Sequence, residues 1–280
     1  MEFADTISIT HLICLAGLIS LACWLLKTSL GRRALADSAP RRNDMPLYLP
    51  FVPLFIWFAA VWLAASIAGA LIGDLEGWQG DFLDNLVLSV GELTAVAVII
   101  FLARAHFARR LKGFGLNVKT VLEDFLVAFL NLLTVWPLMM AAITLTMFFG
   151  ALIWGTEYRM QQHQELQLIT QYSQLPLRVL IVVVAVVVAP LLEELLFRGL
   201  FQTAIRSFLS AFRLRQSAWL SILASSGLFA IIHANAGHWP ALFVLGVCLG
   251  YAYEKSGSLF RPIFIHSIFN AVSVTAALSQ

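Results

Sequence analysis

The stretch from Leu177 to Phe197 reads LRVLIVVVAVVVAPLLEELLF, a long apolar run that contains two adjacent acidic residues, Glu193 and Glu194. The hydrocarbon core of a bilayer is about 30 Å thick, and a helix of about 20 apolar residues crosses it. The stretch has this length, so it predicts a transmembrane helix. An ionisable side chain inside such a helix costs at least about 2.5 kcal/mol and therefore marks a candidate functional position.

The whole chain has the composition of a membrane protein. Of its 280 residues, 60% are hydrophobic and only 12% are charged, whereas about a quarter of a soluble domain is charged. The net charge of +2 gives no reason to expect a nucleic-acid partner. Cys14, Cys23 and Cys248 lie in apolar runs without CxxC or Cys/His spacing, so no disulfide framework or zinc knuckle is indicated. We expect an integral, multi-pass membrane protein surrounded by lipids.

Several stretches besides the first are long and apolar enough to be spans. Together the predicted spans cover residues 7–26, 47–73, 86–103, 122–154, 177–197, 217–235, 239–253 and 259–278. The first follows an acidic start and exceeds the apolar part of a signal peptide, so it is read as a retained span. Pro137 predicts a kink in the fourth. The sequence therefore predicts an all-α, polytopic helix bundle of about eight spans.

The basic residues predict which side of the membrane each loop faces. With the N-terminus outside, every Lys and Arg except Arg159 and Arg178 falls in a cytoplasmic loop or span end. The acidic loop 74–85 then lies outside. Both termini are thus predicted on the non-cytoplasmic side. The compact basic loops fit a bacterial inner membrane.

Polar residues form three patterns in the C-terminal half of the chain. The fifth span carries Glu193, Glu194 and Arg198, the sixth Phe229 and His233, and the eighth His266 and Asn270. Glu194 and Arg198 are four residues apart, on one helix face and in the favourable order for an ion pair. Glu193 is rotated about 100° from Glu194 and needs another partner. We expect the three patterns to converge in one site.

Each pattern alone also has an ordinary structural interpretation. A Glu-Glu pair before an arginine can be an interfacial ion pair, and a single histidine is more often structural than catalytic. His266 and Asn270 can form an interhelical hydrogen-bond pair. These interpretations weaken because all three patterns occur in order between residues 193 and 270. Glu92 in the third span belongs to no pattern, and a structural or substrate-cavity role is favoured for it.

The ordered set Glu193-Glu194-x-x-x-Arg198, Phe229-x-x-x-His233 and His266-x-x-x-Asn270 resembles the CPBP family. This family includes CAAX prenyl endopeptidases of the Ras-converting type and bacterial proteins labelled as bacteriocin-processing or self-immunity proteins. The resemblance covers about residues 150–280 and includes Phe197-Arg198-Gly199, Gly246, Gly250 and, more weakly, Gly113-Phe114-Gly115-Leu116. Residues 1–110 carry no family signal, so the chain is divided into N-terminal helices, 1–110, and a protease-like core, 111–280.

The resemblance implies an intramembrane endopeptidase that acts on a membrane-associated or prenylated peptide or protein. It implies that Glu193 and His233 activate water and that His266 and Asn270 stabilise the oxyanion. It also implies a structural role for Glu194 with Arg198. Phe229 lies four residues before His233, so its ring is expected to pack beside the imidazole. A metal-free mechanism is favoured, so no cofactor is expected. Zinc held by Glu193, His233 and His266 is the alternative, because two His and one Glu form a known catalytic set.

Two other functions stay open. A non-catalytic immunity or scaffold protein would keep the Glu194–Arg198 pair but has no evident use for His233 together with Asn270. A proton-coupled transporter would place Glu and His along a pathway. Against the transporter, the sequence shows no inverted halves, and its intramembrane polar residues cluster in the last third.

Overall fold

The computed structural model describes residues 9–73, 75–160, 164–233 and 235–279, and their regular structure is helical. The α-helices are α1 (Ile9–Lys27), α2 (Phe51–Ile72), α3 (Trp78–His106), α4 (Arg110–Phe114), α5 (Val121–Trp154), α6 (Gln164–Gln171), α7 (Leu175–Val183), α8 (Ala189–Glu194), α9 (Thr203–Ala211), α10 (Ser217–Ile231), α11 (Trp239–Ser256) and α12 (Phe260–Leu278). Two π-helical segments, η2 (Val184–Val188) and η3 (Leu195–Gln202), join α7, α8 and α9. Short 3₁₀ turns are η1 (Val118–Thr120) and η4 (Ala236–His238). The all-α prediction is confirmed for the described residues.

By length and composition, five helical segments within the described residues can cross a membrane. They are Phe51–Ile72, Trp78–His106, Val118–Trp154, Leu175–Ala211 and Phe260–Leu278. The apolar helices His11–Lys27 and Ser217–Ile231 are shorter. Helices follow the predicted spans in order, but the count of eight spans and the side of each terminus stay predictions. Residues 7 and 8 of the first predicted span lie outside the described residues.

Three predicted boundaries are wrong. The third span, predicted to begin at 86, begins at Trp78 in the structure, so residues 78–85 of the predicted loop 74–85 are helical. The fifth span, predicted to end at 197, continues as one helical segment to Ala211. Its polar residues beyond 197 are buried against α11 rather than placed in lipid; for example, Gln202 Nε2 donates to the carbonyl of Gly250 at 3.1 Å. The sixth predicted span, 217–235, ends at Ile231, so His233 follows the helix instead of lying inside it. There the chain turns into η4, where the side chain of Asn235 accepts a hydrogen bond from the backbone N–H of Gly237.

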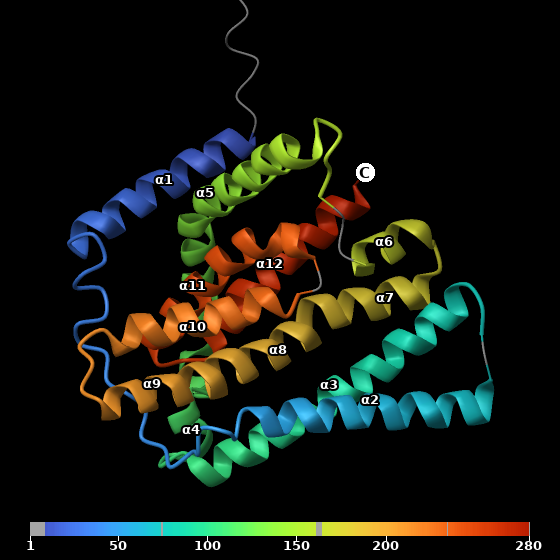
Figure 1. Ribbon diagram of the computed structural model, residues 1–280, viewed down its shortest axis with the longest axis horizontal. Helices are drawn as coiled ribbons and strands as arrows, with labels where there is room; N and C mark the ends of the chain where they lie inside the picture. Colours follow the sequence, from blue (N-terminus) through green and yellow to red (C-terminus); the bar gives the residue numbers. More distant parts are fainter. Residues whose placement is uncertain (1–8, 74, 161–163, 234, 280) are drawn as a thin grey trace, which may run out of the picture.

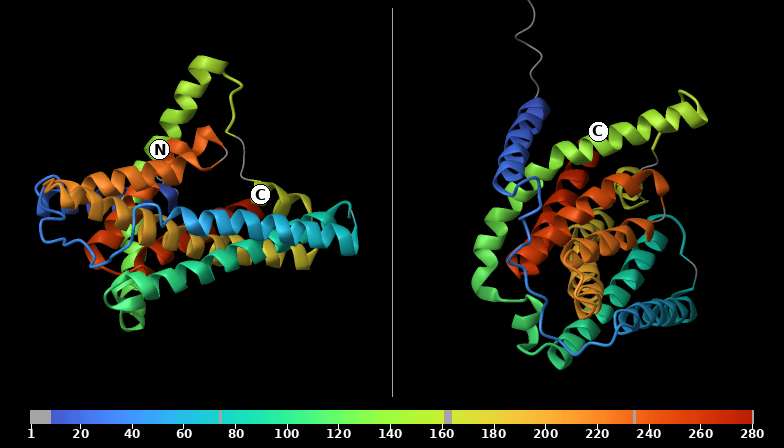
Figure 2. Two further views of the ribbon diagram at one scale, coloured as in Figure 1. Left: turned by 60° about the horizontal axis from the view of Figure 1, so that its bottom comes forward. Right: turned by 60° about the vertical axis from the view of Figure 1, so that its left-hand side comes forward.

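The helices surround a central group formed by α7 to α12 (Figure 1). Helices α1 and α5 pack together on one side of this group, and α5 contacts both α11 and α12. Helices α2 and α3 pack on the other side, where α3 contacts α7 and α8 (Figure 2). The helices of residues 1–110 therefore lie against the predicted core on both sides. The division of the chain at residue 110 stays a prediction.

The long helix α5 bends along its length (Figure 2), as expected for a helix that contains Pro137. Proline cannot donate a hydrogen bond to the carbonyl four residues earlier, which is that of Leu133. Helix α1 comes close to this point through Gly17. A Cβ atom on Gly17 would lie 2.4 Å from the Leu133 carbonyl oxygen and 2.8 Å from the Pro137 ring. Glycine thus lets α1 pack directly on the bend.

The connections that carry the basic residues meet at one end of the bundle. Asn43, after α1, pairs with Phe107, after α3, and its side chain donates to Ser207 of α9. The backbone N–H of Leu259, between α11 and α12, donates to the carbonyl of Gly115 at 2.9 Å. This grouping is the one that the distribution of Lys and Arg predicts for cytoplasmic loops.

Two glycines on α11 allow it to approach η3 and α10 closely. A Cβ atom on Gly246 would lie 3.0 Å from the Ser226 side chain, and one on Gly250 would lie 2.7 Å from the Gln202 side chain. Small residues at such positions let membrane helices come together and expose their carbonyls to polar partners. The carbonyl of Gly246 accepts a hydrogen bond from Arg198 Nη2 at 3.2 Å. Close packing of α11 thereby positions the arginine of the candidate site.

Candidate active site

Glu193 and Glu194 lie in α8, a short α-helical piece between the π-helical segments η2 and η3. Such π-helical turns are rare in proteins, and those that do occur are frequently found at functional sites. Pro190 explains why the helix changes to the π pattern at η2. Proline has no backbone N–H, so it cannot donate a hydrogen bond to the carbonyl of Val186, four residues earlier. The backbone N–H of Ala189 instead donates to Val184, in the i→i+5 pattern. The sequence therefore changes helix type just before the two glutamates.

Glu194 is fully buried between the side chains of Arg198 and His266. Its Oε2 atom lies 3.1 Å from Arg198 Nε, and its Oε1 atom lies 3.0 Å from His266 Nδ1. Arg198 is also fully buried, and its guanidinium carbon lies 4.5 Å from the ring centroid of Phe229. A buried carboxylate needs such partners, because desolvation of an isolated charge is very costly. Glu194 thus ties α8 to α12 as well as to Arg198.

The Glu194 contact fixes the orientation of His266. A carboxylate only accepts hydrogen bonds, so Nδ1 of His266 carries the proton in this contact. The other ring nitrogen, Nε2, then faces Glu193, whose Oε2 atom lies 3.8 Å away. The Glu193 side chain is 23% exposed, whereas that of Glu194 is 0% exposed. The adjacent glutamates therefore occupy different environments, one closed and one open.

His233 follows α10 and reaches the same region. Its Nδ1 atom lies 2.7 Å from the carbonyl oxygen of Phe229, which places a proton on Nδ1. The Phe229 ring lies edge-on to both histidines, at 4.9 Å from His233 and 5.6 Å from His266 between ring centroids. Phe229 is thus the packing element between the second and third sequence patterns.

Asn270 lies one turn after His266 on α12 and contacts η2. Its Nδ2 atom donates to the carbonyl of Ala185 at 2.7 Å. In the π pattern this carbonyl would be paired with the N–H of residue 190, which is proline and has none. Asn270 therefore satisfies a carbonyl that the helix itself leaves unpaired. An amide nitrogen carries two hydrogens, so the second can serve another acceptor.

A cavity of about 420 Å³ collects these side chains. Glu193, His233, His266 and Asn270 all line it, so each of the three sequence patterns contributes to one space. Its volume lies in the range of about 300–1,000 Å³ that is typical of ligand pockets. Apolar side chains such as Ile143, Leu242 and Phe269 form much of the remaining wall. The structure thus brings together all four residues that the resemblance marks as catalytic.

The cavity also has polar lining residues outside the three patterns. Glu92 of α3 is half-buried and lines this cavity, and its role stays a prediction. His238, at the end of η4, is a lining residue that sequence reasoning missed. The contact between Glu194 and His266 was also missed, because 72 residues separate the two positions. No spacing rule within one helix reveals such a contact.

Zinc can be tested against the placement of these side chains. Among the described residues, no group of three or more His, Cys, Asp or Glu side chains is arranged to hold a metal ion. The Nδ1 atoms of His233 and His266 are held by a carbonyl and a carboxylate, respectively, as is common for histidines that bind zinc through Nε2. The metal-free mechanism and the zinc alternative both stay predictions.

Comparisons with known proteins converge on this part of the chain. Residues 175–272, which contain all the predicted site residues, match the family model of type II CAAX prenyl endopeptidase Rce1-like proteins. The "Putative membrane peptidase YdiL" of Bacillus subtilis (strain 168) is 28% identical over 99 residues, which cover 35% of this chain and 38% of that protein. The "Uncharacterized 24.3 kDa protein" of Escherichia coli is 35% identical over 83 residues, which cover 29% of this chain and 36% of that protein. No solved structure matches the chain.

The matches span little more than a third of these two relatives. They confirm the resemblance that the three motifs indicate. With the five long apolar helices, they also support an integral membrane protein. Residues 175–272, about a third of this chain, are therefore similar to Rce1-like proteins, the type II CAAX prenyl endopeptidases.

Proposed function

We propose that this chain is an intramembrane endopeptidase of the CAAX type that hydrolyses a peptide bond with water. The cavity that joins Glu193, His233, His266 and Asn270 within the family-matched segment carries the proposal. It provides an open carboxylate, an oriented histidine on each side, and an amide donor. These are the groups that water activation and oxyanion stabilisation require.

Glu193 is the proposed general base. Its carboxylate takes a proton from a water molecule, while the basic Nε2 of His233 accepts a hydrogen bond from the same water and orients it. The hydroxide oxygen forms a bond with the carbonyl carbon of the substrate, whose oxygen becomes the oxyanion. Glu193 then returns the proton to the leaving nitrogen as the C–N bond breaks. No cofactor is required for this sequence.

His266 and Asn270 are the proposed oxyanion donors. Asn270 uses the N–H that does not bond to Ala185. His266 donates from Nε2, which requires a proton on that nitrogen in addition to the one on Nδ1. Glu194 and Arg198 act as positioning residues, because they hold His266 in the orientation that presents Nε2 to the cavity.

The substrate is proposed to be a membrane-associated or prenylated peptide or protein, since the cavity is lined largely by apolar side chains and lies among apolar helices. We place the chain in a bacterial inner membrane with both termini outside. The meeting of the basic connections at one end of the bundle supports this orientation.

Cleavage of a quenched-fluorescent farnesylated CAAX peptide by the purified chain tests the proposal. We expect cleavage by the wild type, loss of cleavage in Glu193→Gln, and no effect of a metal chelator. Inhibition by chelator that added zinc reverses would favour the metal mechanism. A Glu193→Gln protein that supports the full cellular function would favour a scaffold, and ion-dependent flux in liposomes would favour a transporter.

A further inference from the structure

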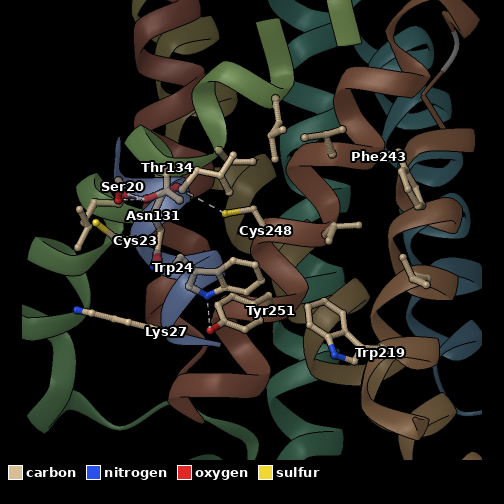
Figure 3. A pocket seen from close by; sticks show the side chains of 17 residues that line it. Ser20, Cys23, Trp24, Lys27, Asn131, Thr134, Trp219, Phe243, Cys248 and Tyr251 are labelled. Carbon is tan, nitrogen blue, oxygen red and sulfur yellow. Dashed lines mark hydrogen bonds between the residues drawn. The ribbon is translucent and has the colours of Figure 1, made fainter. Parts of the chain in front are cut away.

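A second cavity, of about 520 Å³, lies between α1, α5, α10 and α11 (Figure 3). It shares no lining residue with the cavity that contains Glu193. One face of α11, formed by Val244, Val247, Cys248 and Tyr251, supplies one wall. The opposite wall comes from α1 and α5. This cavity is therefore separate from the proposed reaction site.

Aromatic side chains form one end of this apolar cavity. Trp24 Nε1 donates to the hydroxyl of Tyr251 at 2.9 Å, and the Trp219 ring stacks on the Tyr251 ring at 5.9 Å between centroids. The three rings join α1, α10 and α11 (Figure 3). Trp and Tyr are enriched where a membrane protein passes from hydrocarbon to headgroups. The aromatic end is therefore the end expected at the level of the headgroups.

Cations gather beyond the aromatic end. Lys27 lines the apolar cavity, and an adjoining cavity of about 500 Å³, which shares Trp24 and Trp219 with it, is lined by Arg32, Arg206 and Arg215. Arg206 is paired with Glu254 at 3.2 Å. Within the described ranges, no carboxylate forms an ion pair with Lys27, Arg32 or Arg215. These three cations lie at the end of the bundle where the basic connections meet.

We propose that the two adjoining cavities bind one anionic phospholipid of the membrane. An acyl chain occupies the apolar cavity, and the phosphate lies beside Lys27, Arg32 and Arg215. Basic pockets between membrane helices on the cytoplasmic side recognise anionic headgroups in this way, and Arg and Lys form charge-assisted hydrogen bonds with phosphate. The proposal goes beyond the peptidase function and does not depend on it.

Retention of matched lipids by the purified full-length chain tests this site. The protein in neutral detergent is offered phosphatidylglycerol or phosphatidylcholine with identical chains, and retained lipid is measured by native mass spectrometry. We expect at least tenfold preferential retention of phosphatidylglycerol. This comparison uses the wild type alone, so it does not depend on the folding of any variant. Equal retention of the two lipids would overturn the proposal.

Charge variants then locate the headgroup. The triple variant Lys27→Gln, Arg32→Gln, Arg215→Gln removes cations that each favour an anionic headgroup by about fivefold, so the preference should disappear. The matched control Arg33→Gln, Arg104→Gln, Arg109→Gln removes three exposed cations that line neither cavity, and it should keep the preference. Equal loss in both triple variants would overturn the site and indicate a diffuse surface effect.

A cavity-filling variant locates the acyl chain. Val247→Trp places a bulky ring on the α11 wall, and it should lower retention of both lipids at least fivefold while the thermal unfolding temperature stays within a few degrees. Displacement of phosphatidylglycerol by a farnesylated peptide would assign the cavity to a substrate chain and overturn the lipid proposal. Unchanged retention in Val247→Trp would also contradict it.

Discussion

The segment from α8 to α9 carries two buried charge clusters that differ in their balance. In the first cluster, Glu194 pairs with Arg198 and His266, whereas Glu193 lies 3.8 Å from His266 and has no ion pair with an arginine among the described residues. In the second, one carboxylate, Glu254, lies 3.2 Å from Arg206 and 3.8 Å from Arg41. It also accepts a hydrogen bond from Ser38.

The difference separates a reactive site from a structural one. In the second cluster, both carboxylate oxygens of Glu254 have partners. These contacts join the connection after α1 to α9 and α11. The first cluster uses Glu194 in the same way but leaves Glu193 beside a cavity with two histidines. A carboxylate that is not needed to neutralise a buried arginine is available as a base. The following changes test this distinction, in order of decreasing expected effect.

Glu193→Gln is expected to have the largest effect on cleavage. Loss of the general base should lower the rate of peptide cleavage by about 10³-fold, while the unfolding temperature stays near that of the wild type. Cleavage kinetics and thermal unfolding are measured on the same preparation. Glu123→Gln, at a largely exposed ion pair with Arg261, is the matched control and should cleave normally.

Glu194→Gln and Glu254→Gln should both destabilise the fold. Each removes the carboxylate from a buried pair and leaves arginine uncompensated, which costs about 3–5 kcal/mol. Denaturant unfolding in detergent measures this loss. At temperatures where the variants are folded, only Glu194→Gln should also lower the cleavage rate, because the charged carboxylate beside His266 is replaced by a neutral amide. A normal rate in Glu194→Gln would show that the first cluster does not position His266.

Asn270→Ala should lower the cleavage rate by about 10²-fold, the usual effect of removing one oxyanion donor. Asn85→Ala is its control, because Asn85 of α3 also donates to a backbone carbonyl, that of Asp81, but lines neither cavity. Similar rates in the two variants, measured at saturating and limiting substrate, would remove Asn270 from the chemistry and leave it a structural partner of Ala185.

Gly199→Ala should have the smallest effect and should act on stability alone. A Cβ atom at Gly199 would lie 2.3 Å from the Phe114 ring, so overpacking should cost about 1–3 kcal/mol. Gly227 of α10 has no such neighbour within 4 Å, and Gly227→Ala should be neutral or stabilising by less than about 1 kcal/mol. Unfolding measurements that rank these variants in the opposite order would contradict the packing of Phe114 on η3.

Much of the fold could be predicted because apolar runs of about 20 residues have few alternatives in a membrane. The helix over Val121–Trp154 and the proximity of Glu194 to Arg198 both follow from local sequence. The end of α10 at Ile231 does not follow from local hydropathy, because the turn after it depends on Asn235 and Gly237.

The residues of the candidate site could be predicted from the sequence, but the contacts among them could not. The motifs identified Glu193, His233, His266 and Asn270, which the structure places around one cavity. The partner of His266 could not be inferred, since contacts between α8 and α12 depend on helix packing. The π pattern at Ala185 has a local cause in Pro190, but the contact of this carbonyl with Asn270 depends on how α12 packs against η2. Periodicity within one helix cannot contain such information.

The most direct test of the central claim is a single-turnover cleavage in H₂¹⁸O, with excess protein and mass analysis of the new C-terminal carboxyl group. If Glu193 activates water, the first product carries one ¹⁸O atom, and Glu193→Gln forms no product on the same time scale. A first-turnover product with only ¹⁶O would show that a protein oxygen attacks the substrate. Either that result or undiminished cleavage by Glu193→Gln would contradict the proposed role of Glu193.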